Sequence, residues 1–228
     1  MSIPLCVPFE LKDEAKQAGA RWHPVERVWA CDCKLLHSAA YAILEPFVPD
    51  MYRRGWQPPY VVPCLVPQTV WGRNLRSVLP KEEWDVVRRA AYRAAGSRCR
   101  ICGGRGPNWP VEADEVWHYD DGARTHTLMT VVALCPNCHH VRHWGKTRLD
   151  GREPEALAHA SRINGWADEI ASAVVRAAFD TWQARSAHRW ISNFDWVTRT
   201  HGFVIEDAGI ARSESANQSL IQVAKCRA

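Results

Sequence analysis

The sequence lacks the features of a membrane protein, an exported protein or a disulfide framework. No stretch approaches the ~20 consecutive apolar residues that a membrane-spanning helix needs. The first residues, Met1-Ser-Ile-Pro-Leu-Cys, hold no basic segment followed by an apolar run, so no secretory signal is expected. The chain has 9 cysteines, an odd number, and those with metal-binding spacing favour a reducing compartment over disulfides. We therefore expect a cytoplasmic protein without a membrane partner.

A strong excess of one charge is also missing. The 228 residues include 29 Lys and Arg against 25 Asp and Glu, a formal net charge of +4. This mild excess permits nucleic-acid binding but does not argue for it, so the distribution of basic residues matters more. Apolar residues make up 46% of the chain, enough for most of it to fold around one core or two small ones.

Composition divides the chain into segments of different character. We predict a small N-terminal α+β domain over residues 1–50 and a Pro-rich extended linker, packed along the surface, over residues 51–79. Residues 80–150 combine a helix with a domain that holds four regularly spaced cysteines, and residues 151–205 have helical periodicity. Residues 206–228 are polar without periodicity, which is typical of a disordered tail.

Four cysteines carry the clearest chemical signal. They form two Cys-x-x-Cys pairs, Cys99–Cys102 and Cys135–Cys138. Two such pairs predict a tetrahedral Zn²⁺ site. A closed shell of four thiolates leaves no position for chemistry, so this zinc should be structural.

The residues around the two pairs indicate the fold of the zinc domain. The first pair is followed by Gly103-Gly104-Arg105-Gly106, which suits a zinc knuckle on a tight turn. The second pair leads into Cys138-His139-His140-Val141-Arg142-His143, which reads as the first turns of a helix. A knuckle on a hairpin and a second pair at a helix start make a treble clef, so we predict an α+β fold class.

Two histidines after the second pair offer a different ligand set. His139 and His143 are four residues apart, so they share one helix face. That face is rotated ~100° from Cys138 about the helix axis. These imidazoles therefore point away from the zinc and either bind a different ion or bind none.

Basic residues gather near the first cysteine pair. The predicted helix over 81–95 and the segment after it contain Arg88, Arg89, Arg93, Arg98, Arg100 and Arg105. A run of charges is usually a solvated face, but the neighbouring zinc site makes contact with nucleic-acid phosphates an equal alternative. Lys146 adds a further basic residue after the second pair.

The N-terminal segment resembles a known small domain. The resemblance rests on Val7-Pro8-Phe9, Lys12 to Lys16, Gly19-Ala20-Arg21-Trp22 and Trp29. The family is a domain of unknown function that recurs in plasmid and phage proteins, including DNA primases of conjugative elements. Trp22 and Trp29 either form the core of this small domain, which we favour, or make a stacking platform for single-stranded nucleic acid.

Residues 95–148 resemble the HNH family of nucleases, also called ββα-metal or His-Me finger nucleases. The resemblance rests on the cysteine frame, the acidic stretch Val111-Glu112-Ala113-Asp114-Glu115, and the run Leu134-Cys135-Pro136-Asn137-Cys138-His139. The segment His143-Trp144-Gly145-Lys146 is similar to the end of the colicin-type motif. The resemblance implies a ββα-metal fold acting on DNA.

The resemblance also implies a second metal site. His139 and His143 fall on the helix ligands of the family, and Asp114 falls on the ligand in the first strand. One carboxylate and two imidazoles suit a divalent ion such as Mg²⁺, Mn²⁺ or Ni²⁺ bound to the scissile phosphate. His139 would thereby take part in catalysis.

The general base of the family is changed in this chain. The family has a histidine where this sequence has Glu115, and its orienting asparagine aligns with Thr130. Glu115 can activate water only if burial raises its pKa. His118 and His126 are alternatives. Alternation along a strand places His118 on the same face as Asp114 and turns Glu115 to the other face, which favours His118 as the base.

Three functions follow from this pattern. The first is a metal-dependent DNA endonuclease of a bacterial, plasmid or phage system. The second is a catalytically degenerate HNH fold that binds nucleic acid without cutting it, which the changes at Glu115 and Thr130 favour. The third is an adaptor or inhibitor that binds a protein partner and uses zinc only for its structure.

Overall fold

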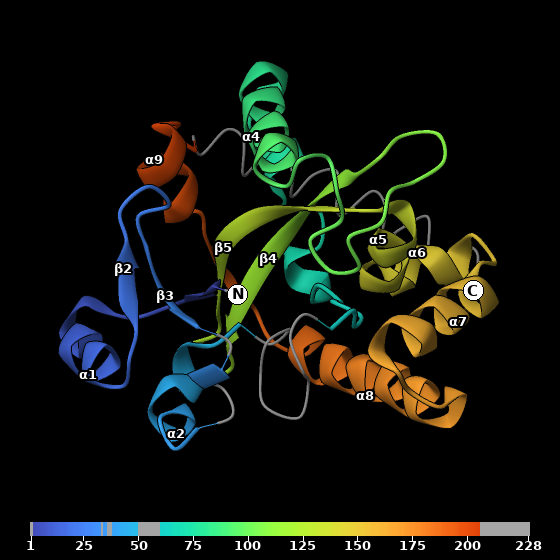
Figure 1. Ribbon diagram of the computed structural model, residues 1–228, viewed down its shortest axis with the longest axis horizontal. Coiled ribbons are helices and arrows are strands. Elements are labelled where there is room, and N and C mark those ends of the chain that lie inside the picture. Colours follow the sequence, from blue (N-terminus) through green and yellow to red (C-terminus); the bar gives the residue numbers. More distant parts are fainter. Residues whose placement is uncertain (1, 33, 36–37, 50–59, 206–228) are drawn as a thin grey trace.

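The α+β fold class is confirmed, with 47% helix and 18% strand. The computed structural model describes residues 2–32, 34–35, 38–49 and 60–205. Within these ranges, two three-stranded sheets lie side by side and helices flank the larger one (Figure 1). The expected tail over 206–228 and part of the expected linker lie outside the described residues. No helix in the described ranges is long and apolar enough to cross a bilayer.

The smaller sheet belongs to the N-terminal unit. Its strands are antiparallel in the order β1-β3-β2. Trp29 packs against the core of this unit, whereas Trp22 contacts Trp29 edge-on and remains 50% exposed. Trp29 therefore belongs to the core of this unit, while Trp22 leaves part of its ring at the surface. The elements are β1 (Ser2–Leu5), η1 (Phe9–Leu11), α1 (Lys12–Gln17), β2 (Arg21–His23), β3 (Val28–Asp32), α2 (Tyr41–Leu44) and η3 (Glu45–Phe47).

The larger sheet is built on one long hairpin. β4 (Glu112–Asp120) and β5 (Thr125–Leu134) are antiparallel, and β6 (Ile191–Asn193) adds to β5 in parallel. The register shifts by one residue opposite the step from Val116 to Trp117, which makes a β-bulge. Asp120 closes the turn, because its carboxylate accepts hydrogen bonds from the amides of the following residues.

The two faces of this hairpin bury different cores. Val116 and Met129 join the apolar cluster of the N-terminal unit. Trp117 and Leu128 join a second cluster, formed with the helix after Pro80 and the segment around Trp190. The hairpin therefore packs against the N-terminal unit on one face and against the helices on the other, and the buried apolar area stabilises both contacts.

Helices supply the remaining structure, as expected for the segments after residues 80 and 150. α4 starts and ends within one residue of the predicted helix over 81–95. α5 to α8 lie together on one side of the hairpin (Figure 1). The bounds are η5 (Gln68–Val70), α3 (Leu75–Val78), α4 (Lys81–Ala94), α5 (Pro136–Arg142), α6 (Trp144–Leu149), α7 (Glu153–Asn164), α8 (Asp168–Ser186) and α9 (Asp195–His201).

The described part of the expected linker, residues 60–79, alternates between buried and exposed positions and is partly enclosed by the fold. Val61, Val70 and Leu75 are fully buried. The side-chain amide of Asn164 accepts from the backbone of Val61 and donates to it, at 3.0 and 2.8 Å. The proline content therefore marks an extended segment that fills the space between helices, held by burial and backbone hydrogen bonds.

Gly106 is a sterically required glycine in the knuckle region. A Cβ at this position would overlap the carbonyl oxygen of Trp109 and approach Pro136 to 2.7 Å. We predict that Gly106→Ala lowers the free energy of unfolding by about 1–3 kcal/mol, as overpacking usually does. Gly145→Ala is the control, because its nearest neighbour is Leu65 at 3.9 Å and alanine favours a helix. Equal unfolding midpoints in urea for the two variants would contradict the prediction.

Candidate metal centres

The first cysteine pair lies on a tight turn after α4. The amide of Gly103 donates to the carbonyl of Cys99, and the amide of Cys99 donates to Gly104, both at 2.9 Å. Gly103 has a φ of +69°, a conformation that favours glycine. The amide of Gly104 points at the sulfur of Cys102, 3.4 Å away. The turn is therefore a knuckle that presents both sulfurs to one point.

The second pair lies at the start of α5. Cys135 is the N-cap residue, and Pro136 occupies the first helical position, where no amide donor is needed. Cys138 is in the first turn and is fully buried. The helix start thus places two sulfurs opposite the knuckle.

The four sulfurs lie close enough together to share one ion. Their Sγ atoms all lie within 4.8 Å of one another, and Cys102 and Cys135 are 3.5 Å apart. Tetrahedral zinc with Zn–S bonds of about 2.3 Å requires sulfurs about 3.8 Å apart. The cluster could hold a metal ion, consistent with structural zinc.

Thiols this close cannot all ionise without a cation. A hydrogen bond with Cys138 favours the thiolate of Cys135, but neighbouring Cys99 and burial outweigh it and raise the pKa of Cys135 to about 12. A divalent ion supplies the positive charge that such a group of thiolates requires.

A second cluster brings together the three residues expected to bind a catalytic ion. Asp114 on β4, His139 on α5 and His143 after it offer ligand atoms within 4.8 Å of one another. His143 Nε2 lies 2.9 Å from Asp114 Oδ1, and the two imidazole rings are 4.3 Å apart. Asp114 is buried, whereas the side chain of His143 is 48% exposed. The sequence therefore predicted this convergence.

Glu112 is a member of this site that the sequence did not single out. Its Oε2 lies 2.6 Å from His139 Nδ1, and its Oε1 accepts from the indole of Trp109 at 2.8 Å. The hydrogen bond with His139 lowers the pKa of Glu112 to about 2. A carboxylate that holds one nitrogen of a histidine orients the ring for a metal at the other nitrogen. Strand alternation from Asp114 was the available signal.

Arg142 is a second member that sequence reasoning missed. Its Nε donates to Asp114 Oδ2 at 2.9 Å, and both side chains are almost fully buried. Burial alone would raise the pKa of Asp114, but the charges of Arg142 and the two histidines lower it below its ordinary value. Asp114 is thus ionised, with one oxygen committed to Arg142. No spacing rule connects a helix arginine to a strand aspartate, so the sequence held no signal for this pair.

The structure does not bring the expected general bases to this cluster. Glu115 points toward α3, where its carboxyl oxygens accept from the amide of Leu75 and the indole of Trp117. His118 is buried four residues along β4, ~13 Å from Asp114 at the usual strand rise. His126 is buried beside Trp117 with its Nε2 on Ser192, and Thr130 pairs with Val116.

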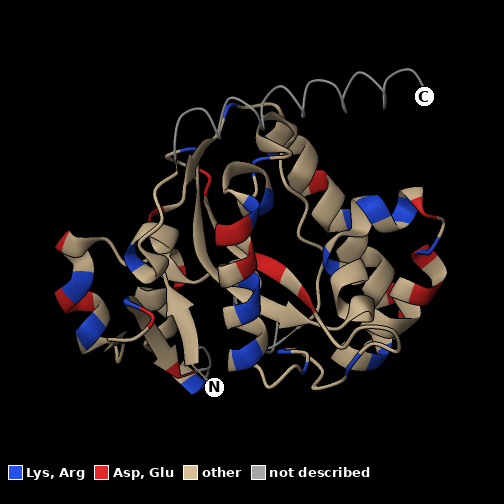
Figure 2. Cartoon of the chain, turned by 90° about the horizontal axis from the view of Figure 1, so that it is seen from above, with Lys and Arg blue, Asp and Glu red and all other residues tan. Residues whose placement is uncertain are grey.

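Most of the expected nucleic-acid contacts also have partners within the chain. Arg98 and Arg105 donate to backbone carbonyls of the knuckle region, at Gly103 and Gly96. Figure 2 shows basic and acidic residues interspersed along the helices. The further contacts are those of Arg88 and Arg89 with Asp85, Arg100 with Ser2, and Lys146 with Asp150. These contacts are mostly at the surface, and Arg89, Arg93, Arg98 and Arg100 remain exposed.

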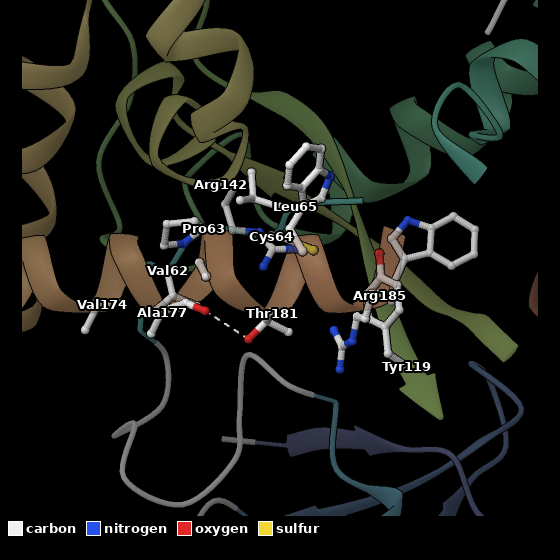
Figure 3. A pocket seen from close by; sticks show the side chains of 13 residues that line it. Val62, Pro63, Cys64, Leu65, Tyr119, Arg142, Val174, Ala177, Thr181 and Arg185 are labelled. Atoms are coloured by element: carbon white, nitrogen blue, oxygen red, sulfur yellow. Dashed lines mark hydrogen bonds between the residues drawn. The ribbon is translucent and has the colours of Figure 1, made fainter. Parts of the chain in front are cut away.

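A cavity of about 270 Å³ lies beside the second cluster, between residues 62–65, β4 and α8 (Figure 3). Arg142 and Arg185 are both among its lining residues. The guanidinium of Arg185 lies 4.4 Å over the ring of Tyr119 and pairs with Asp121 at 2.8 Å. Both arginine charges are thus already neutralised by carboxylates. The cavity is mostly apolar and holds neither group of candidate metal ligands.

Comparison with known proteins identifies only the N-terminal unit. Residues 3–30 match the model of a domain of unknown function, DUF5710. This match agrees with the expected small N-terminal domain, but it covers a minor part of the chain and names no chemistry. No HNH family model matches. No curated protein and no solved structure matches the chain.

The four cysteines predict one metal ion per chain. We expect purified protein to contain one equivalent of zinc, and Cys138→Ser to lose it and unfold at lower urea concentration. Cys6→Ser removes a cysteine outside the cluster and should retain the metal. Elemental analysis by mass spectrometry checks both variants, and a metal-free wild type would contradict the assignment.

The buried carboxyl group of Glu115 should make the stability of the protein depend on pH. Burial is the main cause that raises the pKa of its carboxyl group to about 8. Between the unfolded value of ~4.3 and about 8, the folded chain binds a proton that the unfolded chain has lost, so stability falls as pH rises. Glu115→Gln removes this titration. Relative to the variant, wild type should lose on the order of 2–4 kcal/mol between pH 5 and pH 8 in urea unfolding, and parallel pH profiles would contradict this.

Proposed function

We propose that this chain is a zinc-stabilised ββα-metal protein whose second cluster binds a divalent ion and supports cleavage of DNA phosphodiesters. The observation that carries the proposal is the convergence of Asp114, His139 and His143 beside the four-cysteine cluster. The hairpin of β4 and β5 followed by α5 has the ββα order that the resemblance implies. The fold alone would not argue function, so the weight lies on the ligand set.

The first ion in this proposal is structural zinc. The sulfurs of Cys99, Cys102, Cys135 and Cys138 complete a tetrahedral shell, so this ion stabilises the knuckle and the start of α5. Because His139 directly follows Cys138, the zinc fixes the helix turn that carries the second ligand set.

The second cluster suits a divalent ion by its donor set and by its present hydrogen bonds. His143 Nε2–H donates to Asp114 Oδ1 at 2.9 Å, and once this proton is lost both atoms can bind a cation. Glu112 holds His139 through Nδ1, and Arg142 holds the other oxygen of Asp114. The carboxylate and the imidazole of His139 are therefore oriented before any ion binds.

Each residue has a defined role in this proposal. Asp114, His139 and His143 bind the ion, while Glu112 and Arg142 position the first two of them. An ion such as Mg²⁺, Mn²⁺ or Ni²⁺ would act there as a Lewis acid on the scissile phosphate and stabilise the leaving oxygen. The exposed edge of His143 leaves the cluster open to a large substrate.

A second candidate function is nucleic-acid binding without cleavage. The observation that favours it is the orientation of Glu115 toward α3 and the distance of His118 from Asp114. Neither side chain is placed to take a proton from water at the cluster, and proton removal typically contributes 10²- to 10⁴-fold to such reactions. An adaptor that binds a protein partner is the remaining alternative.

Plasmid nicking tests the proposal. We expect wild type to nick supercoiled DNA with Mg²⁺, Mn²⁺ or Ni²⁺, and His139→Ala to lose at least about 100-fold of that rate because a ligand is lost. His140→Ala is the matched control, since His140 lies on the same helix and pairs with Arg152 instead. Glu115→Gln and His118→Gln should retain activity if neither is the base.

The outcomes separate the three functions. Nicking that survives His139→Ala contradicts the proposed site. Salt-dependent DNA binding without nicking in any of the metals supports the binding function. Absence of DNA binding at low salt leaves the adaptor function.

A further inference from the structure

His159 on α7 contacts the most buried sulfur of the four-cysteine cluster. Its Nε2 lies 3.1 Å from Cys138 Sγ, and both residues are buried. On the other side of the ring, a guanidinium nitrogen of Arg162 lies 2.9 Å from His159 Nδ1. A continuous path therefore runs from an exposed arginine through one imidazole to the sulfur.

The direction of both hydrogen bonds follows from the chemistry of the groups. A guanidinium only donates, so Arg162 must donate to Nδ1 of His159. In a neutral imidazole whose Nδ1 accepts, the proton is on Nε2. His159 Nε2–H therefore donates to the sulfur of Cys138.

The charge of the site explains why such a donor matters. Four thiolates and one Zn²⁺ carry a net charge of −2, and this cluster lies among apolar residues such as Val141, Trp144 and Ala160. A buried charge is costly unless hydrogen bonds or opposite charges compensate it. Cys102 receives the amide of Gly104, whereas Cys138 is fully buried and receives its donor from α7.

We propose that His159 and Arg162 form an outer-shell pair that retains zinc by donating a hydrogen bond to the Cys138 thiolate. The pair makes α7 part of the metal centre, even though this helix contributes none of the four cysteines. The proposal rests on the proposed zinc site and is independent of DNA cleavage. The four sulfurs already complete a tetrahedral shell, so His159 acts from outside it.

Three variants separate the hydrogen bond from simple packing. His159→Phe fills the space without a donor, His159→Gln restores an N–H donor, and Arg162→Met removes the residue that fixes the tautomer. Arg152→Met is the matched control, because Arg152 is also an exposed arginine that pairs with a histidine, His140, at 3.4 Å. That histidine has its Nε2 on the arginine and not on a sulfur.

The measurement is zinc release from the full chain to a colorimetric chelator. We expect His159→Phe to release zinc about 10- to 100-fold more readily than wild type, as loss of an outer-shell partner usually does. Arg162→Met should show a smaller increase, while His159→Gln and Arg152→Met stay close to wild type. The Co²⁺-substituted proteins give a second readout, because loss of the N–H donor should move the thiolate-to-cobalt charge-transfer band to lower energy.

The contrary results are distinct. Wild-type release rates and an unchanged Co²⁺ band in both His159→Phe and Arg162→Met would overturn the outer-shell pair while leaving the zinc site intact. If His159→Phe does not fold, Arg162→Met decides, since Arg162 is exposed. A wild type that binds neither zinc nor Co²⁺ would overturn this proposal together with the zinc site, whatever the result of the nicking assay.

Discussion

The register of the β4–β5 hairpin is the constraint on which both candidate metal centres depend. Glu112 pairs with Leu134, the residue directly before the N-cap Cys135. This pairing puts the start of β4 next to the start of α5, so that Glu112 and Asp114 on one strand face meet two histidines of the helix. A slip of one residue would turn both carboxylates to the opposite face of the sheet. The β-bulge lies beyond this region and leaves its register intact.

The buried ion pair between Asp114 and Arg142 sets the electrostatics of the second cluster. A carboxylate buried without a partner would be protonated, and a protonated group is a poor metal ligand. Arg142 keeps Asp114 ionised and occupies only Oδ2, so Oδ1 is left to face His143. The arginine thus prepares the carboxylate for a cation while lowering the net negative charge that attracts one. Removing Asp114 would leave a buried guanidinium without its carboxylate, and removing Arg142 would favour the protonated form of Asp114.

Local patterns in the sequence predicted much of the two sites, whereas contacts across the fold were out of its reach. Cys-x-x-Cys spacing and the four-residue interval from His139 to His143 are properties of a turn and of a helix, so they survive into the structure. Alternation along β4 likewise predicted that Glu115 points away from Asp114.

Apart from Glu112, the missed features join segments distant in sequence. Arg142 reaches β4, His159 reaches α5, and Val61, Val70 and Leu75 are buried although the prolines around them resemble those of a surface linker. Such contacts are chosen by packing and charge compensation in three dimensions, and no periodicity in the chain encodes them.

The second cluster depends on the four-cysteine cluster through α5, whereas the four-cysteine cluster does not depend on the second. The cysteines hold the first turn of this helix from both sides, by the knuckle and by α7, and His139 is the next residue after Cys138. Loss of the structural ion would release the helix start and thereby separate His139 from Glu112. Loss of an ion from the second cluster would leave Asp114 paired with Arg142 and α5 in place. The four-cysteine frame can therefore persist whether or not the second cluster holds an ion, so the frame by itself is no argument for DNA cleavage.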